Sequence, residues 1–217
     1  MASHRDFHHV MTIMGLLREG TTGMEPPASV TLVREYGRDP FLVLIACLLS
    51  LRTKDTISLP VSRRLFSWAQ TPQEILSLSV EDIQKLIYPV AFYRRRAVNL
   101  KEVCAALIER FDGKVPDTRE KLMSLPGVGL KTANLVLSMG FNVSALCVDT
   151  HVHRISNRFG LVHTKTPEET EKALQKVIPQ DLWIEYCNLL VMWGQNVCKA
   201  RGQRCKEYAL TDYCSCT

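Results

Sequence analysis

The 217-residue sequence predicts an all-α fold, for three reasons. Apolar residues recur at helical spacing along most of the chain, and no segment alternates apolar and polar residues as a half-buried strand does. Ser, Thr and Asp precede several of these segments, and such residues are typical helix N-caps. No repeat of fixed period is found, which argues against a solenoid. We therefore expect a compact helical body that ends in a cysteine-bearing tail.

The expected helices follow one another with short polar turns between them. Residues 8–18 form the first, and Gly and Pro at 20–27 mark a loop. Residues 41–51 are apolar on all sides, which on a helix means burial at the centre of a domain. Asp55 is expected to cap the next helix. The other helices are expected at 29–36, 55–68, from 71, from 79, and at 94–111, 116–124, 131–139, 150–159, 167–177 and 182–195.

Along the chain we expect an N-terminal extension at 1–27, a helical body at 28–197 and a cysteine-rich loop at 198–217. No long linker separates independent halves. In space, residues from about 40 to 150 are expected to form one lobe and the N-terminal and C-terminal helices another. A groove between two such lobes is a common place for a ligand site.

The composition is that of a globular protein, with 46% apolar and 23% charged residues. The net charge of +5 permits a polyanionic partner without demanding one. The longest apolar run, residues 41–51, is far shorter than the roughly 20 residues that span a bilayer, so no membrane helix is expected. We expect a monomer.

Cysteine usage favours a reducing compartment. We expect no secretion leader, and half of the eight cysteines stand inside apolar runs, where cysteine behaves as a small hydrophobe. An intracellular protein is expected, in the cytoplasm or nucleoid of a prokaryote or in the nucleus or an organelle of a eukaryote. The cysteines in apolar runs are Cys47, Cys104, Cys147 and Cys187.

The segment LPGVGLKTA at 125–133 lies between two helical patterns. Gly127 and Gly129 permit positive φ and leave backbone amides unshielded. Placed before a helix N-terminus, such amides can bind a DNA phosphate without reading bases. A plain helix–helix turn is the alternative, because turns with Gly-x-Gly alone are common.

Four motifs together resemble the endonuclease III family of helix-hairpin-helix DNA glycosylases. They are LPGVGLKTAN from 125, VDTHVHRISNR from 148, LLSLRTKD at 48–55 and LIYPVAFYRRRA at 86–97, and the similarity covers roughly residues 40–215. The resemblance implies a two-lobed helical fold with an iron–sulfur-type C-terminal loop. It also implies removal of oxidised pyrimidines from damaged double-stranded DNA, followed by cleavage of the abasic site by β-elimination.

The resemblance assigns catalysis to Lys131 and Asp149. Lys131 matches the family's nucleophilic amine, and a helix N-terminus with partial desolvation would favour its neutral form. Asp149 matches the carboxylate that stabilises positive charge on the sugar. A solvated lysine and an N-cap aspartate are the bland alternatives, and capping is compatible with catalysis. His151 and His153 point to different helix faces, so we expect structural or DNA-contacting roles for them and no metal site.

Two features narrow the type of glycosylase within the family. Cys47 stands where related adenine glycosylases carry a catalytic glutamate, and the additional C-terminal recognition domain of those enzymes is not expected. Lys131 favours the bifunctional branch over monofunctional relatives. A mismatch or uracil-type glycosylase and a non-catalytic helix-hairpin-helix DNA-binding module remain as alternatives.

By the same resemblance, Phe92 occupies the position of the wedge that enters the DNA and Arg52 that of the gap-filling glutamine. Arg94–Arg96 would supply phosphate contacts, with a solvated charge run as the alternative. Arg201 and Arg204 resemble the family's basic loop beside the DNA backbone.

The cysteine tail departs from the family spacing C-x6-C-x2-C-x5-C. Cys198, Cys205 and Cys214 match the first, second and fourth positions, whereas Tyr208 stands at the third. Cys216 is a candidate replacement ligand. We expect a [4Fe-4S] cluster on the four cysteines, with zinc or a cluster-free loop as alternatives.

Overall fold

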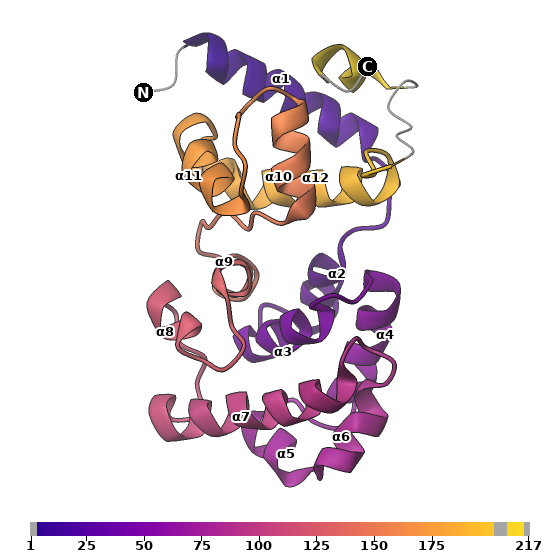
Figure 1. The fold of residues 1–217 in the computed structure, drawn as a ribbon, viewed down its shortest axis with the longest axis vertical. Helices are drawn as coiled ribbons and strands as arrows, with labels where there is room; N and C mark the ends of the chain where they lie inside the picture. The colour runs from indigo at the N-terminus through magenta and orange to yellow at the C-terminus, as the bar shows by residue number, and fades with distance from the viewer. Residues whose placement is uncertain (1–3, 202–207, 215–217) are drawn as a thin grey trace. The chain divides into compact units, whose positions relative to one another are not determined.

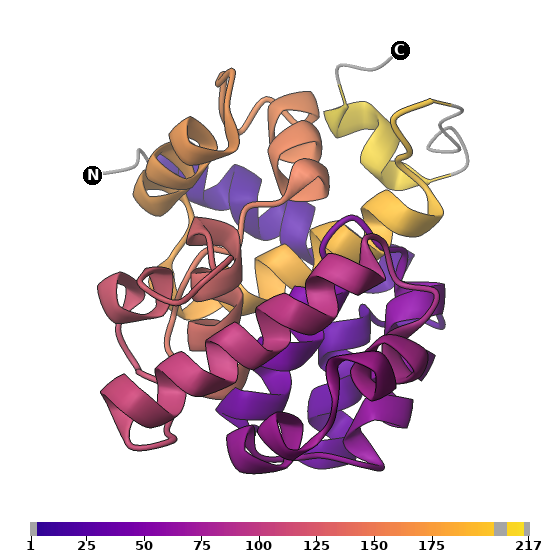
Figure 2. The ribbon, with the colours of Figure 1, turned by 60° about the horizontal axis from the view of Figure 1, so that its bottom comes forward.

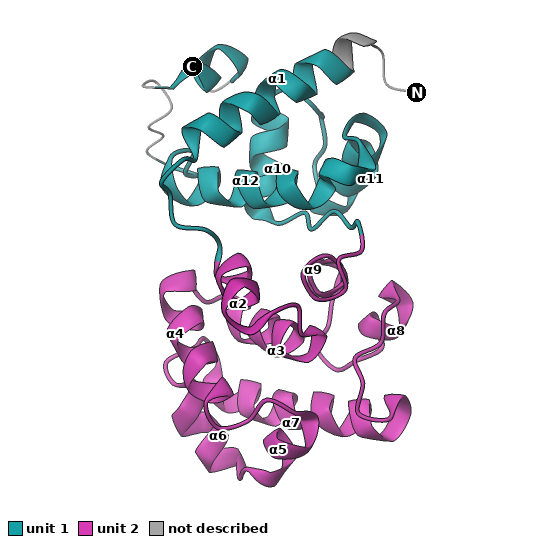
Figure 3. Ribbon diagram, turned by 180° about the vertical axis from the view of Figure 1, so that it is seen from behind, with its two compact units in different colours: residues 1–27, 144–217 teal, residues 28–143 magenta. Residues whose placement is uncertain are grey.

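The computed structural model describes residues 4–201 and 208–214 and confirms the all-α prediction. Within these residues the regular elements are α-helices and short 3₁₀-helices, with no strand. The chain divides into two compact units (Figures 1 and 3). Unit 2 comprises residues 28–143, and unit 1 combines residues 1–27 with 144–217. Unit 1 is thus formed by segments from both ends of the sequence.

Unit 2 contains eight of the α-helices of the described chain. They are α2 (Ala28–Tyr36), α3 (Pro40–Ser50), α4 (Asp55–Phe66), α5 (Pro72–Ser77), α6 (Val80–Ile87), α7 (Tyr93–Phe111), α8 (Arg119–Met123) and α9 (Leu130–Gly140).

Helix α3 is the centre of unit 2, as its apolar sequence predicts. Asp39 caps it by accepting hydrogen bonds from the first-turn amides, and all residues from 41 to 49 are buried. Helix α9 packs against it so closely that a Cβ at Gly140 would come 2.9 Å from the Pro40 Cα atom. Arg38 donates to the carbonyls of Ser138 and Met139, both at 3.2 Å, and so satisfies the C-terminus of α9. Among the described residues, no helix is long and apolar enough to cross a membrane.

Two helix starts differ from the sequence expectation. Asp55 does not cap its own helix, because Lys54 is the N-cap residue of α4. The Asp55 carboxylate instead accepts a hydrogen bond from the Ala28 amide, at 3.0 Å, at the start of α2. The expected helix at 116–124 begins only at Arg119, because the Thr118 side chain caps it through the Lys121 amide.

The long helix α7 packs against α5 and α6 (Figure 2). Its Lys101 ammonium donates to the carbonyls of Leu76 and Leu78, at 3.0 and 2.6 Å. These carbonyls lie at the C-terminus of α5, where a cation also interacts favourably with the helix dipole. Helix α5 is short, so this tertiary contact supplies stability that its length cannot.

Unit 1 is built around one buried apolar cluster to which all of its long helices contribute. Its elements are α1 (His4–Gly20), α10 (Thr150–Arg158), α11 (Pro167–Val177), η1 (Gln180–Leu182), α12 (Trp183–Asn196) and η3 (Ala209–Tyr213). Trp193 and Tyr186 are its largest fully buried side chains. Helices α1 and α12 approach closely, because a Cβ at Gly20 would lie 2.9 Å from the Trp193 ring.

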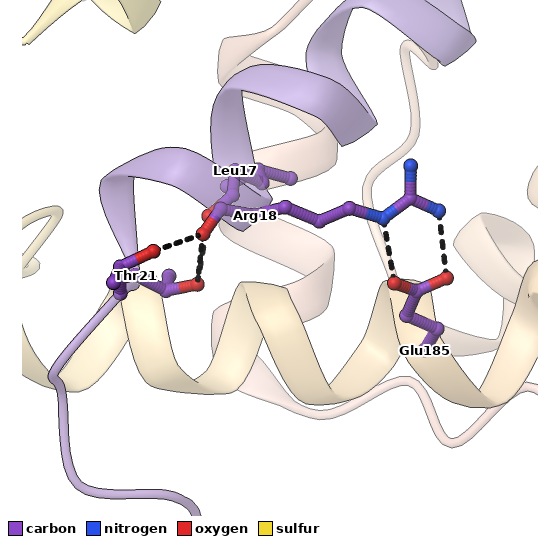
Figure 4. A network of polar contacts seen from close by, with 5 residues as sticks. Leu17, Arg18, Thr21 and Glu185 are labelled. Carbon is purple, nitrogen blue, oxygen red and sulfur yellow. Dashed lines mark hydrogen bonds and ion pairs between the residues drawn. The ribbon is translucent and has the colours of Figure 1, made fainter.

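A polar network joins α1 to α12 on the surface of unit 1 (Figure 4). Arg18 forms a two-point ion pair with Glu185, with Nε–Oε1 and Nη2–Oε2 distances of 2.7 and 2.8 Å. The Thr21 hydroxyl donates to the Leu17 carbonyl at 2.7 Å and closes the C-terminus of α1. The Arg18 contact holds the pKa of Glu185 below its usual value, and the side-chain hydrogen bond is the largest cause of this shift.

Candidate active site and nucleic-acid interface

The turn between α8 and α9 is held by two buried residues and by one side chain from α7. Leu125 and Val128 are 2% and 7% exposed. The Asn99 Nδ2 atom donates a hydrogen bond to the Pro126 carbonyl at 3.0 Å. Gly127 has a φ of +75°, and a Cβ there would come 3.0 Å from the Asn99 amide. The turn therefore needs glycine at position 127 for both its backbone conformation and its space.

Gly129, in contrast, is not required by the fold. It is the N-cap residue of α9 with extended backbone angles, φ −97° and ψ 178°, and a Cβ there would meet nothing within 4 Å. No side chain caps α9, and its first turn carries no acidic residue. The positive end of the helix dipole is thus left for an external anion. These features favour an anion site over a plain helix–helix turn.

Lys131 is the second residue of α9 and belongs to unit 2. Its side chain is exposed. Burial by the protein itself therefore does not supply the desolvation expected from the sequence. A covering ligand would have to exclude water from the amine, and the helix N-terminus supplies the other expected influence.

Asp149 is the N-cap residue of α10 and belongs to unit 1. Its Oδ1 atom accepts hydrogen bonds from the amides of His151 and Val152, at 2.8 and 2.9 Å. These two hydrogen bonds hold the carboxylate in a fixed position at the first turn of α10. Lys131 and Asp149 thus lie in different units.

The two histidines next to Asp149 make separate contacts, as the spacing predicts. His153 Nδ1 contacts the Thr170 hydroxyl at 2.6 Å. His151 Nδ1 lies 3.1 Å from an Arg154 nitrogen, and since a guanidinium only donates, Nδ1 is the acceptor. The His151 ring lies against the backbone of α12, where a Cβ at Gly194 would come 2.2 Å from it. Among the described residues, no group of three His, Cys, Asp or Glu side chains could hold a metal ion.

Arg52 and Phe92 come from loops far apart in sequence and meet at the surface of unit 2. The Arg52 guanidinium lies over the Phe92 ring, 5.9 Å from its centroid, and Phe92 is 64% exposed. Both residues have a positive φ, +59° and +56°. Residues other than glycine rarely adopt that backbone conformation, and those that do are often found at functional sites. The Thr53 hydroxyl accepts a hydrogen bond from the Ala91 amide at 3.0 Å, which fastens the two loops together.

Sequence reasoning missed an aromatic pair beside Phe92. Tyr88 is 59% exposed and meets Tyr93 edge to face, with ring centroids 5.3 Å apart at an interplanar angle of 85°. The Arg94 guanidinium lies over the Tyr93 ring, 5.3 Å from its centroid. The signal available in the sequence was that the aromatic residues at 88, 92 and 93 are followed directly by three arginines at 94–96, because aromatic and basic residues together are typical of nucleic-acid binding.

The three consecutive arginines at the start of α7 differ in their surroundings. Arg94 and Arg95 are exposed, whereas Arg96 is half-buried and its Nε atom has no hydrogen-bond partner. Burial lowers the pKa of Arg96 from its usual value. Burying part of a guanidinium without a hydrogen-bond partner costs free energy, so Arg96 is not simply a solvated charge.

In the cysteine tail, the structure describes Cys198 and Cys214, whereas the expected ligands Cys205 and Cys216 and the expected DNA contact Arg204 lie outside the described residues. Cys198 is buried, and its sulfur accepts a hydrogen bond from Arg158 Nη1 at 3.0 Å. Cationic donors favour a thiolate or a metal-bound sulfur over a neutral thiol.

The remaining described part of the tail is attached to unit 1. Tyr208, at the family's third cysteine position, packs edge to face on Trp193, with ring centroids 4.8 Å apart. Its ring is thus part of the apolar packing and does not replace a thiolate. Arg154 Nη2 donates to the Cys198 carbonyl at 2.7 Å. Arg201 is exposed, as a contact to a DNA backbone requires.

The cysteines in apolar runs are core residues, as expected. Cys47, Cys104, Cys147 and Cys187 are all buried. Burial raises the pKa of the Cys104 thiol to about 12 and that of Cys187 well above its usual value. Neither thiol is therefore a nucleophile near neutral pH.

Comparison with known proteins identifies the class of protein to which this chain belongs. Residues 45–180 match the family model described as "HhH-GPD superfamily base excision DNA repair protein". The chain is 48% identical to "Endonuclease III" of Thermotoga maritima over 176 residues, which cover 81% of this chain and 83% of that protein.

Solved structures agree with this result. "Structure of a non-covalent Endonuclease III-DNA Complex" matches with a TM-score of 0.86 at 32% identity, covering 99% of this chain and 96% of that one. "Structure of a Trapped Endonuclease III-DNA Covalent Intermediate: Estranged-Adenine Complex" matches with a TM-score of 0.79 at 34% identity, covering 94% and 95%. The protein belongs to the endonuclease III family of helix-hairpin-helix DNA glycosylases. It is therefore a base-excision-repair glycosylase with abasic-site lyase activity.

Proposed function

We propose that the protein removes oxidised pyrimidines, such as thymine glycol, from double-stranded DNA and nicks the strand with Lys131 as nucleophile. The observation that carries the assignment is an exposed lysine in the first turn of α9, two residues after a glycine N-cap that leaves the helix dipole uncapped. A phosphate bound at Gly127 and Gly129 would bring the sugar–phosphate backbone to this amine. The solved relative described as a covalent DNA intermediate supports covalent chemistry in the family.

The reaction proceeds in three steps. The neutral Lys131 amine forms a bond to C1′ as the C1′–N bond to the base breaks, and the proton that the attacking amine loses is balanced by one taken up by the departing base. The C1′–O4′ bond then breaks as the lysine nitrogen forms the C=N bond of the Schiff base, and O4′ takes a proton. A proton finally leaves C2′, and the electron pair of the C2′–H bond forms a C2′–C3′ double bond and expels the 3′ phosphate. The Asp149 carboxylate, held as the cap of α10, stabilises the positive charge that develops on the sugar.

Extrusion of the damaged base precedes this chemistry, because a stacked base cannot reach any pocket. Phe92 is exposed and held in a fixed backbone conformation, so it can act as the wedge. Arg52 lies over the wedge and can occupy the space that the base leaves. Arg94, Arg95 and Arg201 are exposed cations that can contact DNA phosphates.

We also propose a [4Fe-4S] cluster on Cys198, Cys205, Cys214 and Cys216. The support is the buried Cys198 sulfur, which receives a guanidinium hydrogen bond suited to a ligated thiolate. When bound, the cluster would join residues 198–216 through iron–sulfur bonds. Broad absorbance at about 400 nm with about four irons per chain would support the cluster, and colourless iron-free native protein would reject it.

Borohydride trapping on abasic DNA tests the nucleophile. Wild type should form the covalent adduct, and Lys131→Gln should form none while binding lesion DNA with similar affinity. Lys121→Gln is the matched control, because Lys121 is also exposed and lies in α8. Equal trapping by Lys131→Gln and wild type would overturn the assignment.

A panel of duplexes tests the substrate class. Thymine glycol should be excised faster than uracil or a mismatched thymine. Preference for uracil or the mismatch would replace the oxidised-pyrimidine proposal. Binding without any excision or trapping would favour a non-catalytic DNA-binding module.

A further inference from the structure

Tyr88 and the half-buried Tyr93 form an aromatic pair that the proposed function does not use, next to the proposed phosphate contact Arg94. Tyr88 is 59% exposed, and its ring contacts Tyr93, whose own ring lies under the Arg94 guanidinium. Single exposed aromatics are common on protein surfaces, but contiguous ones mark interaction sites. Tyr88 begins the loop that ends at Phe92, and Tyr93 and Arg94 follow Phe92 in the first turn of α7.

This loop is held in place before any ligand arrives. Arg64 of α4 donates to the carbonyls of Leu86, at 2.6 Å, and of Tyr88. The Ala91 amide donates to Thr53 on the neighbouring loop. Contacts on both sides of Tyr88 therefore fix the backbone that carries it. A preorganised aromatic side chain loses little conformational entropy when it binds.

The charge around the aromatic pair selects a polyanion. No carboxylate of the described chain pairs with Arg52, Arg94 or Arg95. Arginines without counter-charges next to aromatic rings are the combination that proteins use for nucleic acid, in which phosphates meet the cations and base faces meet the rings. An apolar protein partner would leave these charges unpaired and desolvated.

We infer that Tyr88, backed by Tyr93, is a stacking platform for the orphan base, the base of the undamaged strand whose partner has been extruded. The inference rests on the proposed function. A paired base in a duplex offers only its edges, because its faces are stacked. In the proposed function the damaged base leaves the duplex, and Phe92 and Arg52 take the space it leaves. The orphan base, free of its partner, is the one whose face an aromatic platform can reach.

The platform has a consequence for specificity. Every base has a π-face, so stacking discriminates weakly between bases. The protein should therefore tolerate all four bases opposite the lesion, with affinities within a few fold of one another. The aromatic ring and not the phenolic hydroxyl supplies the contact.

Fluorescence of 2-aminopurine placed opposite a tetrahydrofuran abasic analogue tests the platform, because stacking on an aromatic ring quenches it. Wild type and Tyr88→Phe should quench the probe. Tyr88→Leu should leave it bright and weaken binding about tenfold, the effect expected for the loss of one base–aromatic stack. Trp68→Leu is the matched control, because Trp68 is 67% exposed in another turn of unit 2 and should not matter.

The outcomes separate this inference from the proposed function. Quenching by Tyr88→Leu equal to that by wild type overturns the platform. An equal change when the probe stands one base pair away also overturns it, because the ring would then serve a flanking base. Borohydride trapping by Tyr88→Leu at saturating abasic DNA should match wild type. If the wild-type protein formed no trapped adduct, the result would instead contradict the proposed role of Lys131 as nucleophile. A melting temperature equal to that of wild type excludes misfolding of the variants.

Discussion

The Arg158 guanidinium donates a hydrogen bond to the sulfur of Cys198 at 3.0 Å, across forty residues of sequence. The same Nη1 atom also donates to the Lys199 carbonyl at 3.0 Å, which holds the arginine in place. Helix α10 thus begins at Asp149, the proposed charge partner, and ends at an arginine bound to a proposed metal ligand. One helix positions both.

Loss of this contact should weaken retention of the cluster. Arg158→Gln should lose iron and absorbance at about 400 nm faster than wild type on exposure to a chelator, because the charged donor that stabilises the ligated sulfur is gone. Arg95→Gln, an exposed arginine in unit 2, is the control and should behave as wild type. Unchanged iron retention in Arg158→Gln would show that the hydrogen bond does not support a ligand.

Asp149 offers a clean separation of capping from catalysis. Asparagine caps helices as well as aspartate, so Asp149→Asn should keep the melting temperature while slowing excision by about 100-fold or more. Asp149→Ala should in addition lose about 1 kcal/mol of unfolding free energy. Single-turnover kinetics and thermal melts measure the two effects. If Asp149→Asn excised at the wild-type rate, the residue would be only a cap.

The two glycines of the turn should respond differently to alanine. Gly127→Ala should cost about 1–2 kcal/mol of unfolding free energy, because it forces a side chain into positive φ against Asn99. Gly129→Ala should change stability by less than about 0.5 kcal/mol, because its site is open and its backbone is extended.

Both variants should bind DNA more weakly, since a methyl group shields the amides at the N-terminus of α9. Urea unfolding and fluorescence anisotropy on duplex DNA give the two quantities. If Gly129→Ala bound DNA with wild-type affinity, the N-terminus of α9 would not be a phosphate-binding site.

Acid should reveal the ion pair between α1 and α12. The pKa of Glu185 is lowered in the folded protein, chiefly by its hydrogen bond with Arg18, so the stabilisation is present above the unfolded pKa and is lost as pH falls through the folded one. The pair is partly exposed, with both side chains at 43%, so its effect is screened. Glu185→Gln should lower the unfolding free energy by about 0.5 kcal/mol at pH 7, and the difference should vanish below the folded pKa. Urea unfolding across this range measures it, and a difference that persisted in acid would point to lost packing.

The sequence was sufficient for the features that are local in the chain. The apolar run at 41–51 and the caps at Thr71 and Ser79 marked helices to within a residue or two, because a cap and its helix lie within one turn of each other. The sequence also sufficed to recognise the hairpin motif with Lys131 and the segment with Asp149, because each motif is a short contiguous stretch.

Tertiary structure alone decided the contacts between distant segments. Asp55 satisfies the start of α2 and not of its own helix, Arg52 meets Phe92, and Tyr208 packs on Trp193. Whether Lys131 is buried was equally invisible, since exposure depends on which helices pack around α9. Local sequence sets the backbone preferences of each helix, but the partner of a side chain depends on how all the apolar faces are buried together, and no short motif encodes that.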